Sequence, residues 1–293
     1  VLPGSAIKSD AGIILKTAVS VLFLIPWGDK WIVGTTDTPY EGDRAEPYAS
    51  REDVQYILDQ ANRVLEPKLK AEEIIGVYAG LRPLVANKKS STTTKLSREH
   101  TVDRPVPGFV SIAGGKYTTY RVMGKDAVDR AVIELRRITQ DSVTDKLPLV
   151  GADGYFALEQ QRDRIAQESG LDVDTVTHLL NRYGSLISEI LELITQEPKL
   201  AKKLDPELPY IKAEIVYAAT HEGARTVDDV ISRRTRLAFE AQDHGVHLAD
   251  EVGALIAPVL GWSAKERKES VAAYEELVDR ELAALDELLE ANS

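Results

Sequence analysis

The sequence contains no cysteine, a single methionine and only four phenylalanines among 293 residues. The absence of cysteine excludes disulfide bonds, thiol nucleophiles and metal sites with thiolate ligands. No strictly apolar run is longer than five residues, as at 21–25, whereas a membrane-spanning helix needs about 18 or more. These absences predict an ordinary soluble protein without a transmembrane segment.

Several catalytic motifs are also missing. The chain has no G-x-G-x-x-G, G-x-S-x-G or H-E-x-x-H, so it lacks the dinucleotide fingerprint, the hydrolase nucleophile elbow and the zinc-protease helix. His244 and His247 are three residues apart, but the intervening Gly245 indicates a helix end. Solvated or capping roles are favoured for these histidines, and no metal is expected.

The first residues are Val1, Leu2 and Pro3, without an initial methionine and without the basic and apolar layout of a signal peptide. This start predicts a cut end and a preceding segment that this chain does not contain.

The charge is divided unevenly along the chain. The formal net charge is −11, yet residues 1–145 carry 20 basic and 19 acidic side chains, and residues 146–293 carry 16 and 28. Within the first half, residues 82–125 have a net charge of +7. A local positive field in an acidic protein favours a small anionic ligand over nucleic acid, which the remaining surface would repel.

Hydrophobic periodicity follows the same division. Short apolar runs bounded by glycine and proline predict strands at 12–17, 20–26, 31–36, 74–81, 92–97 and 109–113, with a hairpin turn at 27–29. One helix interrupts them: Ser50 and Asp53 form its capping box, and Val54, Leu58 and Ala61 share its apolar stripe. Neighbouring strands without regular helices between them favour an antiparallel or mixed sheet.

The rest of the chain reads as helical. One long helix follows Thr118, with apolar residues such as Met123 and Leu135 on one face, and a linker rich in helix breakers spans 147–154. Further helices are predicted at 155–169, 172–183, 185–196, 211–222, 226–242, 248–260 and 264–290. The expected fold class is therefore α+β, with a sheet domain at 1–150 and an all-helical domain at 151–293.

The segment 111–121 is the most informative local feature. A strand runs into Gly114 and Gly115, then Lys116, then a helix start. Glycines let backbone approach a ligand, and a helix N-terminus with an adjacent lysine attracts an anion or a growing negative charge. A helix cap built by Thr118 or Thr119 explains the same pattern about equally well.

Two arginines have the chemistry to grip a phosphate or carboxylate with two parallel hydrogen bonds. Arg82 precedes Pro83, which biases it to an extended backbone at a strand end, and a functional role is favoured. Arg98 could act similarly, although neighbouring acidic residues could simply neutralise it. The segment 34–38 has the composition of an ordinary turn.

Four blocks in order resemble the FAD-dependent, quinone-linked glycerol-3-phosphate dehydrogenases. The blocks are IPWG followed by GTTD within 25–37, AGLRPL at 79–84, GGKYTTYR at 114–121 and the longer run at 218–237, which looks like the signature of the family's helical C-terminal domain. The resemblance covers nearly the whole chain. It departs at the front, because the family's strand, glycine loop and helix for FAD are missing.

The resemblance implies roles for matching residues. The expected flavin contacts are Gly114, Gly115, Lys116, Tyr117 and Thr118, and the expected substrate contacts are Arg82, Arg98 and Lys116, with Arg82 and Lys116 as the catalytic pair. The implied reaction oxidises glycerol 3-phosphate to dihydroxyacetone phosphate, with FAD as cofactor and quinone as electron acceptor. The resemblance also implies a cytoplasmic location. Attachment to the inner face of the membrane and formation of a homodimer stay open.

Two alternatives stay open at this point. The parent could be the related glycerol-3-phosphate oxidase that uses oxygen, or the chain could be a non-catalytic structural or interaction module. In either case we expect the isolated 293-residue chain to fold but to be inactive and to retain no FAD, because its sequence lacks the pyrophosphate-binding glycines.

Overall fold

The computed structural model describes residues 1–18, 21–82, 84–85, 99–136, 138–241 and 243–292. It has α+β architecture, as the sequence predicts. A four-stranded sheet has the order β1-β4-β3-β2, and a separate two-stranded sheet pairs β5 with β6; all these pairs are antiparallel. The strands are β1 (Leu2–Pro3), β2 (Ile13–Lys16), β3 (Val21–Trp27), β4 (Lys30–Gly34), β5 (His100–Val106) and β6 (Phe109–Gly114).

The larger sheet is built as the alternation of apolar residues predicts. The hairpin between β3 and β4 turns at Gly28, which has a φ of +61°, and Leu22 and Leu24 face inward with no exposed surface. Helix α1 (Arg51–Ala61) covers this face. Its capping box is confirmed, because Ser50 Oγ accepts from the Asp53 amide and the Asp53 carboxylate accepts from the Ser50 amide.

The helices of the second half form two further cores. One lies around α4, α5 and α6, and the other around α7, α9 and the first half of α10. The Ser263 and Glu266 capping box that starts α10 is confirmed. The helices are α3 (Tyr155–Glu159), α4 (Arg162–Ser169), α5 (Val173–Tyr183), α6 (Ile187–Gln196), α7 (Lys212–Thr220), α8 (Leu237–Glu240), α9 (Ala249–Leu260) and α10 (Ala264–Asn292).

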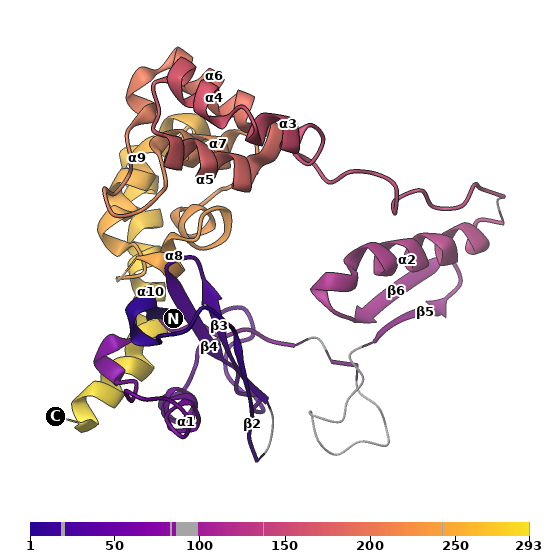
Figure 1. Cartoon of the computed structure of the whole chain (residues 1–293). Coiled ribbons are helices and arrows are strands. Elements are labelled where there is room, and N and C mark those ends of the chain that lie inside the picture. Colours follow the sequence, from indigo (N-terminus) through magenta and orange to yellow (C-terminus); the bar gives the residue numbers. More distant parts are fainter. Residues whose placement is uncertain (19–20, 83, 86–98, 137, 242, 293) are drawn as a thin grey trace.

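The long helix α10 joins the two halves of the molecule. Its first turns pack in the helical region, whereas Ala284 and Leu288 near its end are buried in the core beneath the four-stranded sheet. Figure 1 shows this helix, in yellow, running from the upper helices down past the sheet. The last turns of the chain therefore complete the core of the sheet region.

The remaining unit consists of β5, β6 and α2 (Tyr120–Glu134). Figure 1 shows it standing apart from the other two regions. Helix α2 packs on its own two strands and has no buried side chain along its length. The apolar face that the sequence predicts for this helix is present, but Val128 and Leu135 are more than half exposed.

Two predicted elements differ from the structure, and a third lies outside the described residues. Residues 74–81 form an irregular segment rather than a strand, because no neighbouring strand pairs with them. The helix predicted at 226–242 is a π-helical turn at Asp229–Arg234 followed by α8, because Thr235 adopts an extended backbone and its hydroxyl donates to the Val230 carbonyl at 2.7 Å. Of the strand predicted at 92–97, every residue lies outside the described residues.

Candidate functional site

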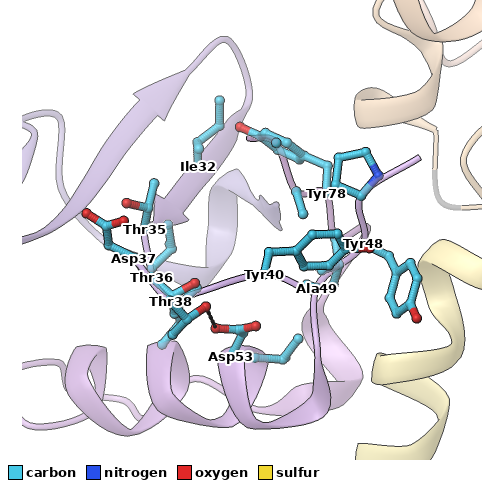
Figure 2. A pocket seen from close by; sticks show the side chains of 18 of the residues that line it. Ile32, Thr35, Thr36, Asp37, Thr38, Tyr40, Tyr48, Ala49, Asp53 and Tyr78 are labelled. Atoms are coloured by element: carbon cyan, nitrogen blue, oxygen red, sulfur yellow. Dashed lines mark hydrogen bonds between the residues drawn. The ribbon is translucent and has the colours of Figure 1, made fainter. Parts of the chain in front are cut away.

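A cavity of about 920 Å³ opens between the four-stranded sheet, α1 and the irregular segment at 74–82. Apolar side chains such as Ile32, Leu58 and Ile74 line one part of it. Polar side chains line another part, where β4 ends and the chain continues as Thr35, Thr36, Asp37 and Thr38. Figure 2 shows these polar residues gathered above α1, with Tyr40, Tyr48 and Tyr78 on the other side. An apolar cavity with a few convergent polar groups is the usual form of a small-molecule site.

Arg82 is fixed at the polar edge of this cavity. Its Nη1 forms an ion pair with the Asp37 carboxylate, and its Nη2 donates to Thr35 Oγ1 at 3.2 Å. The Asp37 side chain is 13% exposed and that of Arg82 is 38% exposed. Since a guanidinium has five N–H donors in a planar fork, this clamp orients the fork while leaving donors for an anionic ligand.

Asp53 is occupied by the local structure of the cavity rim. One of its carboxylate oxygens accepts from Thr38 Oγ1 at 3.4 Å, the contact drawn in Figure 2, and the other accepts from the Ser50 amide at 3.1 Å. The residue thus joins the loop after β4 to the start of α1. This use in capping explains Asp53 without a role in chemistry.

Sequence reasoning missed Thr35 and Asp37 as site residues. It interpreted 34–38 as an ordinary turn, whereas the structure places this run against Arg82, 45 residues further along the chain. The available signal was the position of a polar run directly after a buried strand. Turn composition alone cannot separate a loop that faces solvent from one that lines a cavity.

The segment 114–118 lies on the separate unit at the end of β6. Gly114 and Gly115 have φ values of +77° and +88°. These φ values favour glycine by themselves, and a Cβ on Gly115 would also lie 2.5 Å from Sδ of the flexible Met123 side chain. The Thr119 hydroxyl donates to the Lys116 carbonyl at 2.9 Å and accepts from the Lys116 amide at 3.4 Å, so it closes the turn before α2. It accepts no hydrogen bond from an amide of α2, so Thr119 does not form the predicted side-chain cap.

The side chains of this segment remain open to contact. Lys116, Tyr117 and Thr118 are exposed, with Tyr117 at 91%, and Lys116 has no ion-pair partner within the described part of the chain. None of the residues 114–118 lines the cavity that holds Arg82. The structure therefore brings Arg82 together with Asp37 and Thr35, leaves Lys116 on a different unit, and does not describe Arg98.

Metal and membrane signals are absent where the structure is described. No group of three or more histidine or acidic side chains among these residues could hold a metal ion. His244 is buried and its Nδ1 lies 3.2 Å from a Glu281 carboxylate oxygen, whereas His247 pairs with Asp205 and Asp243. No described helix is both long and apolar enough to cross a bilayer.

Two protein families match successive parts of the chain. Residues 4–130 match the FAD dependent oxidoreductase family, and residues 142–267 match the C-terminal domain of alpha-glycerophosphate oxidase. The first match ends within α2, and the second begins in the segment between α2 and α3.

Similar proteins extend over nearly the whole chain. A glycerol-3-phosphate dehydrogenase of Mycobacterium leprae is 48% identical over 96% of this chain and 48% of its own length. The mitochondrial glycerol-3-phosphate dehydrogenase SDP6 of Arabidopsis thaliana is 31% identical over 95% of this chain and 46% of its own. The chain thus spans about half the length of these relatives.

A solved structure agrees with the sequence comparisons. The glycerol-3-phosphate dehydrogenase from Bacillus halodurans, solved in complex with FAD, superposes with a TM-score of 0.81 at 25% identity. The superposition covers 95% of this chain and 55% of that one.

Proposed function

This chain belongs to the family of FAD-dependent glycerol-3-phosphate dehydrogenases, and on that basis we propose that it forms the substrate-side and helical part of such an enzyme. The reaction would oxidise sn-glycerol 3-phosphate to dihydroxyacetone phosphate. The observation that carries this assignment to particular residues is the clamped guanidinium of Arg82 at the edge of the cavity.

Arg82 is the residue we assign to the substrate phosphate. Asp37 and Thr35 take one N–H from each terminal nitrogen, which fixes the plane of the guanidinium before the ligand arrives. Preorganised donors lose less conformational freedom on binding. The remaining N–H groups can then form charge-assisted hydrogen bonds with phosphate oxygens.

The segment 114–118 has two properties that suit contact with a flavin: an accessible backbone and exposed side chains. Its two glycines present backbone without side chains, and the three residues that follow are exposed at the start of a helical segment. When bound, FAD would accept the hydride that leaves C2 of the substrate. We propose that Gly114, Gly115, Tyr117 and Thr118 hold the ring in place and that the Lys116 ammonium stabilises negative charge beside it.

Replacing Arg82 tests the substrate assignment in a full-length enzyme that contains these residues. We expect Arg82→Ala to raise the KM for glycerol 3-phosphate about 30-fold to several thousand-fold, which corresponds to the ~2–5 kcal/mol lost with one member of a buried charged contact. The KM of Arg82→Lys should lie between those of the unchanged enzyme and Arg82→Ala, because lysine keeps the positive charge but lacks the planar fork of N–H donors. Arg63→Ala, an exposed arginine just after α1, is the matched control. An unchanged KM for Arg82→Ala would remove this residue from the site.

Lys116 is tested in the same enzyme by Lys116→Met. We expect turnover to be lost while circular dichroism and the unfolding temperature stay unchanged, since the side chain is exposed and makes no ion pair with a described residue. Normal turnover would leave this segment with only its structural role in the turn before α2.

The electron acceptor and the location are further proposals. We assign quinone as acceptor, because the relatives named above are dehydrogenases, and a cytoplasmic enzyme that contacts the inner membrane face. Reduction of a quinone analogue without hydrogen peroxide release would support this, whereas stoichiometric peroxide would indicate the oxidase. Homodimer formation is tested by sedimentation.

The 293-residue chain by itself provides a test of the cofactor assignment. We propose that it folds, is colourless after purification and oxidises no glycerol 3-phosphate, because no glycine-rich pyrophosphate loop occurs in its sequence. Stoichiometric flavin in the purified chain would contradict this.

We also propose the division into a sheet domain at 1–150 and a helical domain at 151–293. The helical cores support it, whereas the end of α10 is shared, because Ala284 and Leu288 are buried under the sheet. A chain of residues 151–293 should therefore fold with its last turns frayed, which amide hydrogen exchange would detect.

A further inference from the structure

The wall of the cavity that carries Arg82 has no regular secondary structure to hold it. Residues 74–82 line the cavity along most of their length but pair with no strand of the sheet. Two hydrogen bonds attach the start of this segment to Val1, the residue before β1. The Ile75 amide donates to the Val1 carbonyl at 2.9 Å, and the Val1 amino group donates to the Gly76 carbonyl at 2.8 Å. Its further course must be set mainly by side-chain packing.

That packing comes from the helical region. The Phe239 ring in α8 lies 4.9 Å from the Tyr78 ring and 6.5 Å from the ring of Trp27, the last residue of β3. The Arg236 guanidinium covers the Trp27 ring at 5.2 Å. Figure 1 shows α8 beside the ends of β3 and β4. Aromatic pairs at these distances are attractive and directional.

A second contact lies just after α8. The His244 side chain is 2% exposed and packs against Gly76, where an added Cβ would lie 2.6 Å from His244 Nε2. Two contacts on α10 hold His244 in place. Its ring Nδ1 lies 3.2 Å from a Glu281 carboxylate oxygen, and its backbone carbonyl accepts from Tyr274 Oη at 2.5 Å. His244 Nε2 gains no hydrogen bond from a described residue, so the contact with Gly76 is steric.

We propose that α8 and the turn after it act as a wedge that fixes the 74–82 segment and thereby the direction of Arg82. Phe239 and His244 are the positioning residues of this wedge, acting through Tyr78 and Gly76. The inference rests on the proposed role of Arg82 in binding substrate, and it assigns the helical region a direct part in shaping the substrate site. A small displacement of a binding group is enough to weaken a reaction about a hundredfold.

The wedge itself can be tested in the 293-residue chain, without activity. Tyr78 is 47% exposed, but cleavage after it also requires the backbone of 74–82 to leave the cavity wall and enter the active site of chymotrypsin. The cleavage rate therefore follows the population of the released segment. We expect Phe239→Ala to speed cleavage after Tyr78 about tenfold, Phe239→Leu to restore most of the protection, and Phe156→Ala, an exposed phenylalanine in α3, to have no effect. An unchanged rate for folded Phe239→Ala overturns the wedge.

The consequence for the substrate is tested in the full-length enzyme. We expect Phe239→Ala to raise the KM for glycerol 3-phosphate about tenfold with a much smaller change in kcat, and Phe239→Leu to recover most of this loss. In an Arg82→Ala background the same substitution should add little, because both changes act through one guanidinium.

The outcomes separate the two proposals. An equal rise in KM with and without Arg82 overturns the link between wedge and guanidinium, even when cleavage after Tyr78 is faster. A failure of Arg82→Ala alone to change KM overturns the substrate assignment and this link together, while the cleavage result still decides whether the wedge exists. If Phe239→Ala does not fold, Phe239→Leu carries both measurements, with a smaller effect in the same direction.

Discussion

Two helices, α5 and α2, have opposite surroundings in this molecule. Helix α5 has 11 residues and buries five of them, including Leu179 and Tyr183. Helix α2 has 15 residues, also with apolar side chains at helical spacing, and buries none. Both form complete helices, so local propensity is satisfied in each. The difference lies in what covers the apolar side chains. Helix α5 packs with α4 and α6 in a closed core, whereas among the described residues α2 packs mainly on its own two-stranded sheet.

This contrast has a functional side. The helical region has two buried cores of its own and contributes Phe239 and His244, which pack against the cavity wall. The unit of β5, β6 and α2 carries the exposed segment 114–118 that we assign to the flavin. The side chains of Lys116, Tyr117 and Thr118 are exposed. They are therefore accessible to a bound cofactor, as the proposed flavin contact requires.

Replacing a carboxylate in each region should give the largest difference. Glu214 is fully buried and accepts from Tyr183 Oη at 3.1 Å and from the Ile211 amide at 2.8 Å. We expect Glu214→Ala to cost about 3 kcal/mol or more, because each buried donor left without an acceptor costs roughly 1–3 kcal/mol. The free energy of unfolding in urea measures this effect.

The counterpart is Glu134 in α2, which forms an ion pair with Arg104 of β5 at 2.5 Å; the Glu134 side chain is 13% exposed and that of Arg104 is 39% exposed. We expect Glu134→Ala to cost about 1 kcal/mol, because water can solvate the half-exposed Arg104 guanidinium once the carboxylate is removed. Equal losses for the two carboxylates would contradict the contrast between the regions.

Replacing one leucine by alanine in the helical region and one at the end of α2 tests the same comparison. Leu179 has no exposed surface, whereas Leu135, at the end of α2, is 68% exposed. We expect Leu179→Ala to destabilise the helical region by about 2–5 kcal/mol through the cavity it leaves. Leu135→Ala should change stability by less than about 0.5 kcal/mol in this chain. A comparable loss at Leu135 would mean that α2 is covered in solution.

The smallest expected effect concerns pH. His247 Nδ1 lies 2.6 Å from Asp243 and Nε2 lies 3.0 Å from Asp205. Partial burial is the largest single influence and acts downward, but the hydrogen bonds with these two carboxylates raise the pKa of His247 above its ordinary value. Because the folded pKa is the higher one, the stabilisation is fully present below about pH 6.5 and is lost as the pH rises through the folded pKa.

His247→Gln should therefore lower the unfolding temperature at pH 6 more than at pH 9. A difference that grows toward alkaline pH would mean that these contacts do not favour the charged imidazole.

Some residues of the candidate site could be predicted from the sequence, and others could not. Arg82 was recognisable because Pro83 follows it and an extended arginine can grip an anion. Its partner Asp37 was not, since the contact joins residues 45 positions apart and the local composition indicated only a turn. The strand predicted at 74–81 was wrong for a related reason: its apolar residues face a cavity and a helix rather than a second strand.

The sequence by itself determined the features that depend on a few neighbouring residues. These include the capping boxes at Ser50 and Ser263, the hairpin at Gly28, the helical second half and the family blocks. Tertiary structure alone decided which apolar faces are covered and that Arg82 meets Asp37. The physical reason is range: caps and turns are closed by hydrogen bonds across three or four residues, whereas burial and ion pairing depend on partners that only the folded chain brings near.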